Sequence, residues 1–562
     1  MAGRSTGLLG KLEQLKTQYG EGCALGKLEV LRELAGRRLP RATDVQRLHE
    51  VLCFLRAYPD DPHLLARVEA MLDAFSTRPD LRRHRDALQD SGIAGTAIHF
   101  AFFPATAAWL ARRWGEHLTI DWPQFDQQEN LERLLPELVL PGEVAGIDNY
   151  DLDAREWIER FRGPDETDAA FLLLRLAQLP MSSYTLETRF EQLDIPLRLA
   201  PGADTPARTR EKFRPAPISF ASGPLRRPRR SVREQLARPP AVVRTPSPGE
   251  SRRLLDLARG SMVTGQRDMD AFAYGDVSDV RLADTGDGMQ FACIGLIPER
   301  RFVLECLYGF LILKNGVPVG YGSYLGLFSS VEIAFTVFDT FREGDAHDIY
   351  LRTLANAYHL LGYRAFSVDP YQLGRNNEDA IRSGAWWFYQ KTGFEPREPV
   401  QQRLMRTELR RMRADPSRRS SAGTLRKLAQ ANLFLQLGRA RDDVIGILPL
   451  ENIGLQVTRY VAARFGHDRR RAEATCAREA AAVLGVRSLR GFSAGERLAW
   501  RRWGPLISIL PGLERWTRDE KQALAAVVRA KGSRRESDFL RRFDAHQRLR
   551  RSIRRLALRD DV

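Results

Sequence analysis

Between residues 277 and 341 the sequence changes from helical to strand periodicity, and this change limits the folds that the chain can adopt. β-Branched and aromatic residues are frequent there and turn residues separate them, which is typical of short strands. Lys314-Asn315-Gly316 indicates a tight hairpin, because Asn and Gly tolerate the positive φ that such turns require. The predicted strands span residues 289–297, 308–313, 317–325 and 331–337.

Helical patterns flank this segment on both sides. Directly after it we expect a helix over residues 344–361, a strand over 365–369 and a helix over 375–392. Elsewhere, leucines three or four residues apart predict helices, and Asp61-Pro62 indicates the start of one, because Asp caps helices and Pro suits their first turn. These helices are predicted over residues 28–35, 64–72, 171–179, 249–274, 424–438, 450–465, 469–484 and 518–531.

Ten prolines lie between residues 201 and 248, together with the basic run Arg226-Arg227-Pro228-Arg229-Arg230. Because proline removes a backbone donor and fixes φ, this stretch predicts a linker, or an arm that lies across a neighbouring domain. We therefore expect an α+β protein in which a central mixed sheet lies between two mostly α-helical regions. The predicted divisions are an α-helical domain at 1–200, a Pro/Arg-rich linker at 201–239, a mixed domain at 240–405 and a basic α-helical domain at 406–562.

The net charge of +16 is unevenly distributed along the chain. Residues 401–562 hold 37 Lys and Arg against 17 Asp and Glu, and residues 201–250 hold 11 against 4. Because an Arg-rich face attracts phosphates, nucleic acid or anionic surfaces, we expect an anionic partner for the basic C-terminal region. A solvated charged face without a partner explains the same composition.

The cysteines and histidines favour neither a disulfide framework nor a metal site. The five cysteines are scattered without a CxxC pair, and the nine histidines form no pair with the spacing of metal ligands. The chain has no run of 18 apolar residues that predicts a membrane span, and its N-terminal apolar stretch is too short for a secretory signal. We expect a soluble, cytoplasmic, multidomain protein.

The middle of the chain also resembles a known superfamily. Residues 309–321 form a predicted hairpin, residues 331–337 a following strand, and Phe388-Tyr389-Gln390-Lys391-Thr392-Gly393-Phe394 an aromatic ending of the last helix. In this order they resemble the GNAT (acyl-CoA N-acyltransferase) superfamily, over residues 240–405. The resemblance implies an acyltransferase that moves an acyl group from acetyl-CoA or another acyl-CoA, its co-substrate, to an amine acceptor.

The resemblance also implies roles for four residues of this site. Glu332 is the expected general base that deprotonates the amine, and Tyr389 is the expected proton donor to the leaving thiolate. A backbone N–H near Val337 or Phe338 is expected to hold the oxyanion. Two alternatives stay open: Glu332 faces solvent at a sheet edge, and Tyr389 belongs to an aromatic stripe that faces the core.

The expected cofactor loop spans residues 341–346. Gly344 and Ala346 match the superfamily's phosphate loop, but Phe341 occupies the position of its first polar residue, and the basic Arg342 is displaced by one. The resemblance implies that Arg342, Gly344 and Ala346 contact the phosphates, whereas the alternative is a plain turn from strand to helix. Asn377 corresponds to a further cofactor-binding element, but a turn or a helix cap explains it as well.

Three functions are therefore consistent with the sequence. The first is an acyl-CoA-dependent N-acyltransferase whose helical flanks select the acceptor. The second is a non-catalytic GNAT-fold protein that binds or regulates, which the displaced Arg342 favours. The third is a nucleic-acid-associated protein that uses the basic C-terminal region.

Overall fold

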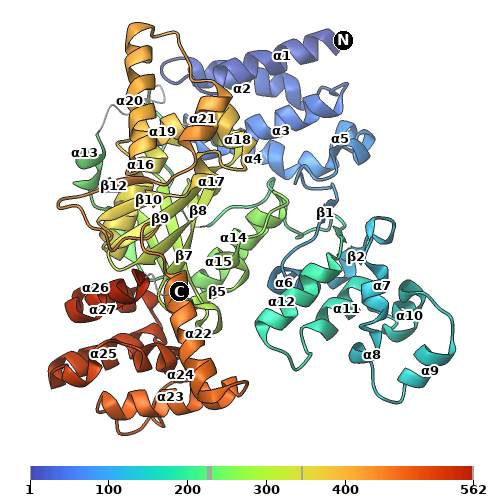
Figure 1. Ribbon diagram of the computed structural model, residues 1–562. Helices are drawn as coiled ribbons and strands as arrows, with labels where there is room; N and C mark the ends of the chain where they lie inside the picture. The colour runs from blue at the N-terminus through green and yellow to red at the C-terminus, as the bar shows by residue number, and fades with distance from the viewer. Residues whose placement is uncertain (1, 215, 224–230, 344–345, 560–562) are drawn as a thin grey trace.

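The computed structural model describes residues 2–214, 216–223, 231–343 and 346–559, and its centre is a nine-stranded mixed sheet (Figure 1). The strand order is β11-β12-β10-β9-β8-β7-β6-β5-β4. The strands are β4 (Val242–Arg244), β5 (Gly275–Asp284), β6 (Met289–Leu296), β7 (Cys306–Lys314), β8 (Val317–Leu327), β9 (Ser330–Val337), β10 (Ala365–Val368), β11 (Glu395–Pro396) and β12 (Leu433–Gln436). The predicted strands β6, β7, β8, β9 and β10 are confirmed, whereas β5 was not predicted.

Neighbouring strands of this sheet run antiparallel, except that β9 and β10 run parallel. The β7–β8 hairpin turns at Asn315 and Gly316, whose φ angles are 51° and 78°, so the predicted Asn-Gly turn is confirmed. A parallel pair needs a crossover connection, and the helix α16 (Ala346–Asn356) with the π-helical turn Ala357–Leu361 supplies it.

Helices cover both faces of the sheet. The helix α14 (Pro248–Val263) and the short helix α15 (Asp270–Ala273) pack Leu254 and Phe272 against Leu311 of β7. On the opposite face, the Tyr324 hydroxyl of β8 donates to the Thr353 carbonyl of α16 at 3.0 Å, and the Tyr324 ring stacks on Phe310 of β7. Because side chains alternate along a strand, these two cores lie on opposite sides of the sheet.

The helix predicted over residues 375–392 is two helices in the structure, α18 (Glu378–Ser383) and α19 (Ala385–Lys391), and a short helix, α17 (Pro370–Leu373), precedes them. Gly384 separates α18 from α19 with a φ of 67°, in the left-handed region that favours glycine. This turn sets the direction of the aromatic ending of the last helix.

Residues 1–200 are more divided than a single helical domain. The helices α1 (Ala2–Leu15), α2 (Cys23–Ala35), α3 (Ala42–Ala57), α4 (Pro62–Asp73) and α5 (Pro79–Arg83) share the main core, and Asp61 caps α4 as predicted. A second core lies in the elements β1 (Ile98–Phe100), α6 (Pro104–Trp114), β2 (Leu118–Ile120), α7 (Gln128–Glu132), α8 (Leu135–Leu138), α9 (Val144–Asn149), α10 (Ala154–Phe161), α11 (Asp168–Leu176), α12 (Ser183–Leu193) and β3 (Leu197–Leu199). Its three strands pair in the order β1-β3-β2.

The proline-rich stretch lies across neighbouring parts of the protein, so of its two predicted forms, a linker or an arm, the arm is confirmed. The backbone N–H of Arg208 donates to the carbonyl of Gly92 at 2.8 Å, that of Phe213 to Gly316 at 2.8 Å, and that of Ala221 to Pro59 at 2.9 Å. We call its residues 201–214 the arm. The stretch also contains the short helix α13 (Val232–Leu236). Its basic run at 226–230 lies outside the described residues.

The C-terminal region is helical, but it also completes the central sheet. Its helices are α20 (Pro399–Ala414), α21 (Ala422–Leu428), α22 (Glu451–Phe465), α23 (Arg469–Val483), α24 (Ala494–Ser508), α25 (Arg518–Lys531), α26 (Glu536–Ala545) and α27 (Gln547–Ala557). The helix predicted over 424–438 is wrong in its second half, because residues 433–436 form β12, which pairs antiparallel with β10. The mixed domain therefore extends past its predicted end at 405. In the described part of the chain, no helix combines the length and the apolar character needed to span a bilayer.

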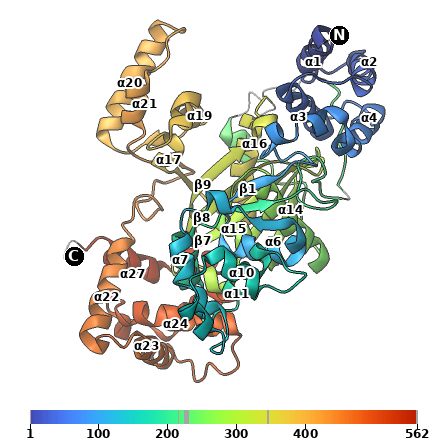
Figure 2. The same ribbon diagram turned by 90° about the vertical axis from the view of Figure 1, so that its right-hand side faces the viewer.

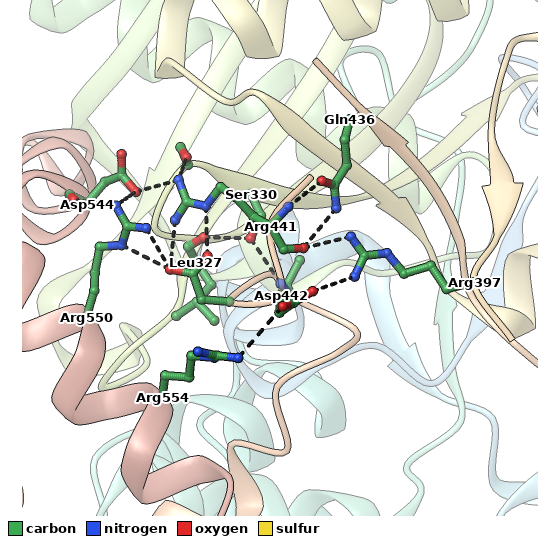
Figure 3. Close-up of polar contacts among 12 residues, drawn as sticks. Leu327, Ser330, Arg397, Gln436, Arg441, Asp442, Asp544, Arg550 and Arg554 are labelled. Carbon is green, nitrogen blue, oxygen red and sulfur yellow. Dashed lines mark hydrogen bonds and ion pairs between the residues drawn. The ribbon is translucent and has the colours of Figure 1, made fainter. Parts of the chain in front are cut away.

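A group of ion pairs joins the C-terminal helices to the sheet (Figure 3). Arg441, after β12, pairs with Asp443 at 2.8 Å and with Asp544 of α26 at 3.0 Å. Arg550 of α27 pairs with the same two carboxylates, at 2.8 and 3.5 Å. The Arg441 guanidinium also donates to the Ser329 hydroxyl in the β8–β9 turn. One arginine thus connects three separate segments of the chain.

We expect Arg441→Gln to lower the free energy of unfolding by about 2 kcal/mol, because two partly buried carboxylates lose a charged partner. Arg439→Gln is the matched control, since Arg439 is exposed on the same loop. Differential scanning calorimetry of both variants checks this expectation. Equal thermal midpoints for the two variants would contradict it.

Candidate functional site

The parallel strands β9 and β10 part after a short contact. Their pairing covers Ala365–Ser330, Phe366–Val331 and Ser367–Glu332, whereas β9 continues to Val337 and stays paired with β8 along its whole length. Among the described strands, none pairs with the second half of β9 on the β10 side. We call this part of β9, residues 333–337, the open edge.

The backbone register tells which amides of β9 face the open edge. The N–H of Phe338 donates to the carbonyl of Val319 in β8 at 3.0 Å, so this amide is already used within the sheet. Val337 lies opposite Gly320, one position earlier. Because amides alternate in direction along an antiparallel pair, the Val337 N–H points away from β8 and toward the open edge. Of the two predicted oxyanion donors, only Val337 has this orientation.

Glu332 lies where the two strands part. It is half-buried between β8 and β10 in the interior of the sheet, so the alternative of a residue at a sheet edge is wrong. Its Oε2 accepts a hydrogen bond from the Asn432 side chain at 3.4 Å. Burial raises the pKa of Glu332 to about 7, and the nearby charge of Asp369 adds to the rise. A carboxyl group with such a pKa can accept a proton near neutral pH.

Tyr389 of α19 lies on the other face of the sheet. Its side chain is 4% exposed, its ring centroid is 5.4 Å from that of Tyr350 in α16, and burial raises its pKa. Tyr350 in turn packs on Phe335 of β9 at 5.2 Å. Since Phe335 and Glu332 point to opposite faces of β9, Tyr389 and Glu332 lie on opposite sides of the sheet. The predicted aromatic packing of Tyr389 is confirmed, and its role as a proton donor stays a prediction.

Tyr350 is a residue that the sequence did not point to. It is fully buried, and its hydroxyl has no hydrogen-bond partner among the described residues. A buried hydroxyl without a hydrogen-bond partner destabilises the folded state. The Tyr350 hydroxyl, next to Tyr389, is therefore a candidate for a functional polar contact. Its only sequence signal is a place inside the predicted helix 344–361.

The loop after β9 differs from the predicted cofactor loop. Phe341 is 4% exposed and stacks on Phe54 of α3, with the ring centroids 6.5 Å apart. Arg342 is exposed and pairs with Asp339 at 2.7 Å, whereas Glu343 pairs with Lys16, the residue after α1, at 2.8 Å. The apolar first position of this loop is therefore explained by packing against the N-terminal helices.

The other predicted cofactor ligands have varied positions. Ala346 is the first residue of α16, and Gly344 lies outside the described residues. Asn377 caps α18: its Oδ1 accepts from the Ala380 N–H at 3.1 Å and its Nδ2 donates to the Tyr371 carbonyl at 3.2 Å. The alternative of a helix cap is thus confirmed for Asn377.

A cavity of about 240 Å³ lies beside this loop, beyond the end of β9. The sequence did not predict it, because its walls come from α3, the arm, the end of α14 and the residues after β9. Arg56, Arg208, Glu211 and Arg267 are among its lining residues. Elsewhere in the described chain, no group of three His, Cys, Asp or Glu side chains could hold a metal ion.

The raised pKa of Glu332 predicts a pH-dependent stability. In the unfolded chain the carboxyl ionises near pH 4.5, whereas in the folded chain it ionises near pH 7, so the folded state loses stability as the pH rises between these values. From pH 5 to pH 8, the free energy of unfolding of Glu332→Gln should therefore rise relative to that of the unchanged protein, by up to roughly 3 kcal/mol. Denaturant titrations at both pH values measure this difference. Glu395→Gln, at an exposed carboxylate of β11, should show no such gain.

No protein-family model matches this chain. Neither a curated protein nor a solved structure matches it. The assignment of a function to this site therefore depends on its residues and their geometry.

Proposed function

We propose that the protein is an acyl-CoA-dependent N-acyltransferase of the GNAT type. The observation that carries the proposal is Glu332, whose pKa is raised to about 7, at the point where β9 and β10 part. The strand order, with an antiparallel meander followed by a crossover helix and a parallel strand, supports the same assignment. Acetyl-CoA or another acyl-CoA is the proposed co-substrate.

The proposed reaction uses groups on both faces of the sheet, beside the open edge. The pantetheine amides pair with β9, and the thioester carbonyl lies near the Val337 N–H. Glu332 takes a proton from the acceptor ammonium, directly or through water, and the free amine attacks the carbonyl carbon. The C–N bond forms, the C–S bond breaks, and the thiolate takes a proton from Tyr389. The burial of Tyr389 disfavours its ionised form, so the phenol must regain its proton from solvent or the acceptor.

The amino terminus of α16, which follows the end of β9 in the chain, supports cofactor binding. The positive end of a helix dipole favours an anion such as pyrophosphate. Against this, Arg342 is occupied by Asp339 and Glu343 adds negative charge. These pairs favour the alternative proposal, a GNAT-fold protein that binds or regulates without turnover.

Calorimetric titration with acetyl-CoA and longer acyl-CoAs, followed by thiol release over a panel of amines, tests the enzyme proposal. We expect binding and turnover, with Tyr389→Phe lowering kcat at least tenfold while the Kd for acetyl-CoA stays nearly unchanged. Tyr371→Phe, at an exposed tyrosine, is the control and should keep full activity. Failure of every acyl-CoA to bind would sink the enzyme proposal, and binding without turnover would favour the alternative.

A specific observation favours nucleic-acid binding as a second candidate function. Figure 2 shows α20 and α21 projecting from the body of the protein. Six exposed arginines of this segment form no salt bridge with any described residue: Arg403, Arg406, Arg410, Arg413, Arg418 and Arg419. A projecting basic helix can follow a phosphate backbone, and such binding weakens steeply with salt.

We expect full-length protein to bind double-stranded DNA or RNA of unrelated sequence at low salt. Replacing Arg403, Arg406 and Arg410 with Gln should reduce the slope of log affinity against log salt concentration by about 3. The same change at Arg469, Arg470 and Arg471 of α23 is the matched control. Fluorescence anisotropy at several salt concentrations gives both slopes, and equal slopes for the two variants would exclude α20 as the contact.

A further inference from the structure

The cavity beside the end of β9 contains an uneven set of charges. Three arginines line it, together with the carboxyl groups of Glu50, Asp90, Glu211 and Asp339. Its walls also carry hydroxyl groups of serine and threonine. Which ligand suits the cavity depends on how many of these charges are already paired.

Three of the four carboxylates have donors close by. Glu50 lies 3.6 Å from Arg208, and Asp339 lies 2.7 Å from Arg342. Asp90 accepts from the backbone N–H of His99 at 2.7 Å and lies 3.1 Å from its Nδ1. These groups are therefore used by the protein itself.

Glu211, the fourth carboxyl group, accepts a hydrogen bond from the Ser261 hydroxyl at 3.3 Å. Burial raises its pKa to about 8, although Arg56, Arg208 and Arg210 act in the opposite direction. At neutral pH it is mainly protonated, and then it can donate a hydrogen bond rather than repel an anion.

Two of the three arginines lack a carboxylate partner. Arg56 is 3% exposed, donates to the carbonyls of Thr209 at 2.7 Å and Arg208 at 2.8 Å, and its Nε has no partner among the described residues. Arg267 donates to the Tyr321 hydroxyl at 3.1 Å, and its guanidinium lies 6.0 Å from the centre of the same ring; no carboxylate of the described residues pairs with it. A buried guanidinium without a counter-ion is costly, and a bound anion would offset that cost.

We propose that this cavity binds a phosphate group of a ligand, with Arg56 and Arg267 as its cationic contacts. The Nε–H of Arg56 and the guanidinium of Arg267 supply charged donors to phosphate oxygens, and the hydroxyls of Ser261, Thr264 and Thr340 lie on the same walls. The site stands apart from the proposed acyl transfer, because none of its contacts uses Glu332 or Tyr389. Two sources carry this chemistry: the phosphates of an acyl-CoA and a separate phosphate compound.

Calorimetric titration of the full chain with inorganic pyrophosphate tests the proposal. Arg267→Gln should weaken binding at least about tenfold, because one charged hydrogen-bond donor is lost. Arg85→Gln is the control: Arg85 is exposed, does not line the cavity, and its loss should leave the affinity unchanged. The proposal fails if pyrophosphate does not bind, or if Arg85→Gln weakens binding while Arg267→Gln does not.

A second readout uses Glu211, since its ionisation places a negative charge beside the bound anion. As the pH rises from 7 to 9, the affinity of the unchanged protein for pyrophosphate should fall relative to that of Glu211→Gln. The Glu211 carboxyl group ionises near pH 8, whereas the glutamine amide of the variant does not ionise. An identical pH dependence in both proteins would overturn the placement of the anion in this cavity, beside Glu211. Folded controls for both variants come from circular dichroism.

Titration with acetyl-CoA and acetyl-pantetheine, which lacks the phosphates, separates the two sources. If Arg267→Gln weakens acetyl-CoA and pyrophosphate alike and leaves acetyl-pantetheine unchanged, the cavity takes the phosphates of the co-substrate. If only pyrophosphate is weakened, the ligand is a separate phosphate compound and the acyl-CoA lies elsewhere. Weaker binding of all three would contradict a phosphate-specific site.

Discussion

The parallel pairing of β9 with β10 is the constraint on which the rest of the molecule depends. Three residue pairs join these strands, and after Ser367–Glu332 the contact ends. A parallel pair cannot be joined by a tight turn, so α16 must cross the sheet between them. That crossing places the start of α16 at the end of β9 and brings Tyr350 beside Tyr389. The open edge, the loop and the aromatic cluster all follow from it.

Much of the fold could be predicted where local chemistry and global fold agree. Asn315-Gly316 and Asp61-Pro62 have one preferred geometry each, and both adopt it. β5 was missed because Asp276, Asp279 and Asp284 hide its apolar alternation. β12 was missed because its four residues follow a helix after only a short turn, and pairing with β10 and β11 makes them a strand. Such tertiary pairing leaves no mark on local periodicity.

The candidate site, too, could be predicted from the sequence only in part. Glu332 could be named from its strand and its resemblance, but its raised pKa comes from burial and from the nearby charge of Asp369, which only the tertiary structure supplies. Phe341 contradicted the expected loop pattern, and the structure gives the reason, since it packs on Phe54. The cavity arginines Arg56 and Arg267 come from segments more than two hundred residues apart in sequence, so no motif could connect them.

The late position of β12 has a consequence for how the protein is made. A ribosome releases β10 well before residues 433–436, so for a time on the order of seconds the outer edge of β10 has no partner. An uncovered strand edge is a template for pairing with other chains. Nascent molecules are therefore most prone to aggregate in this interval, and a shortened protein that ends near residue 405 would keep that vulnerability permanently.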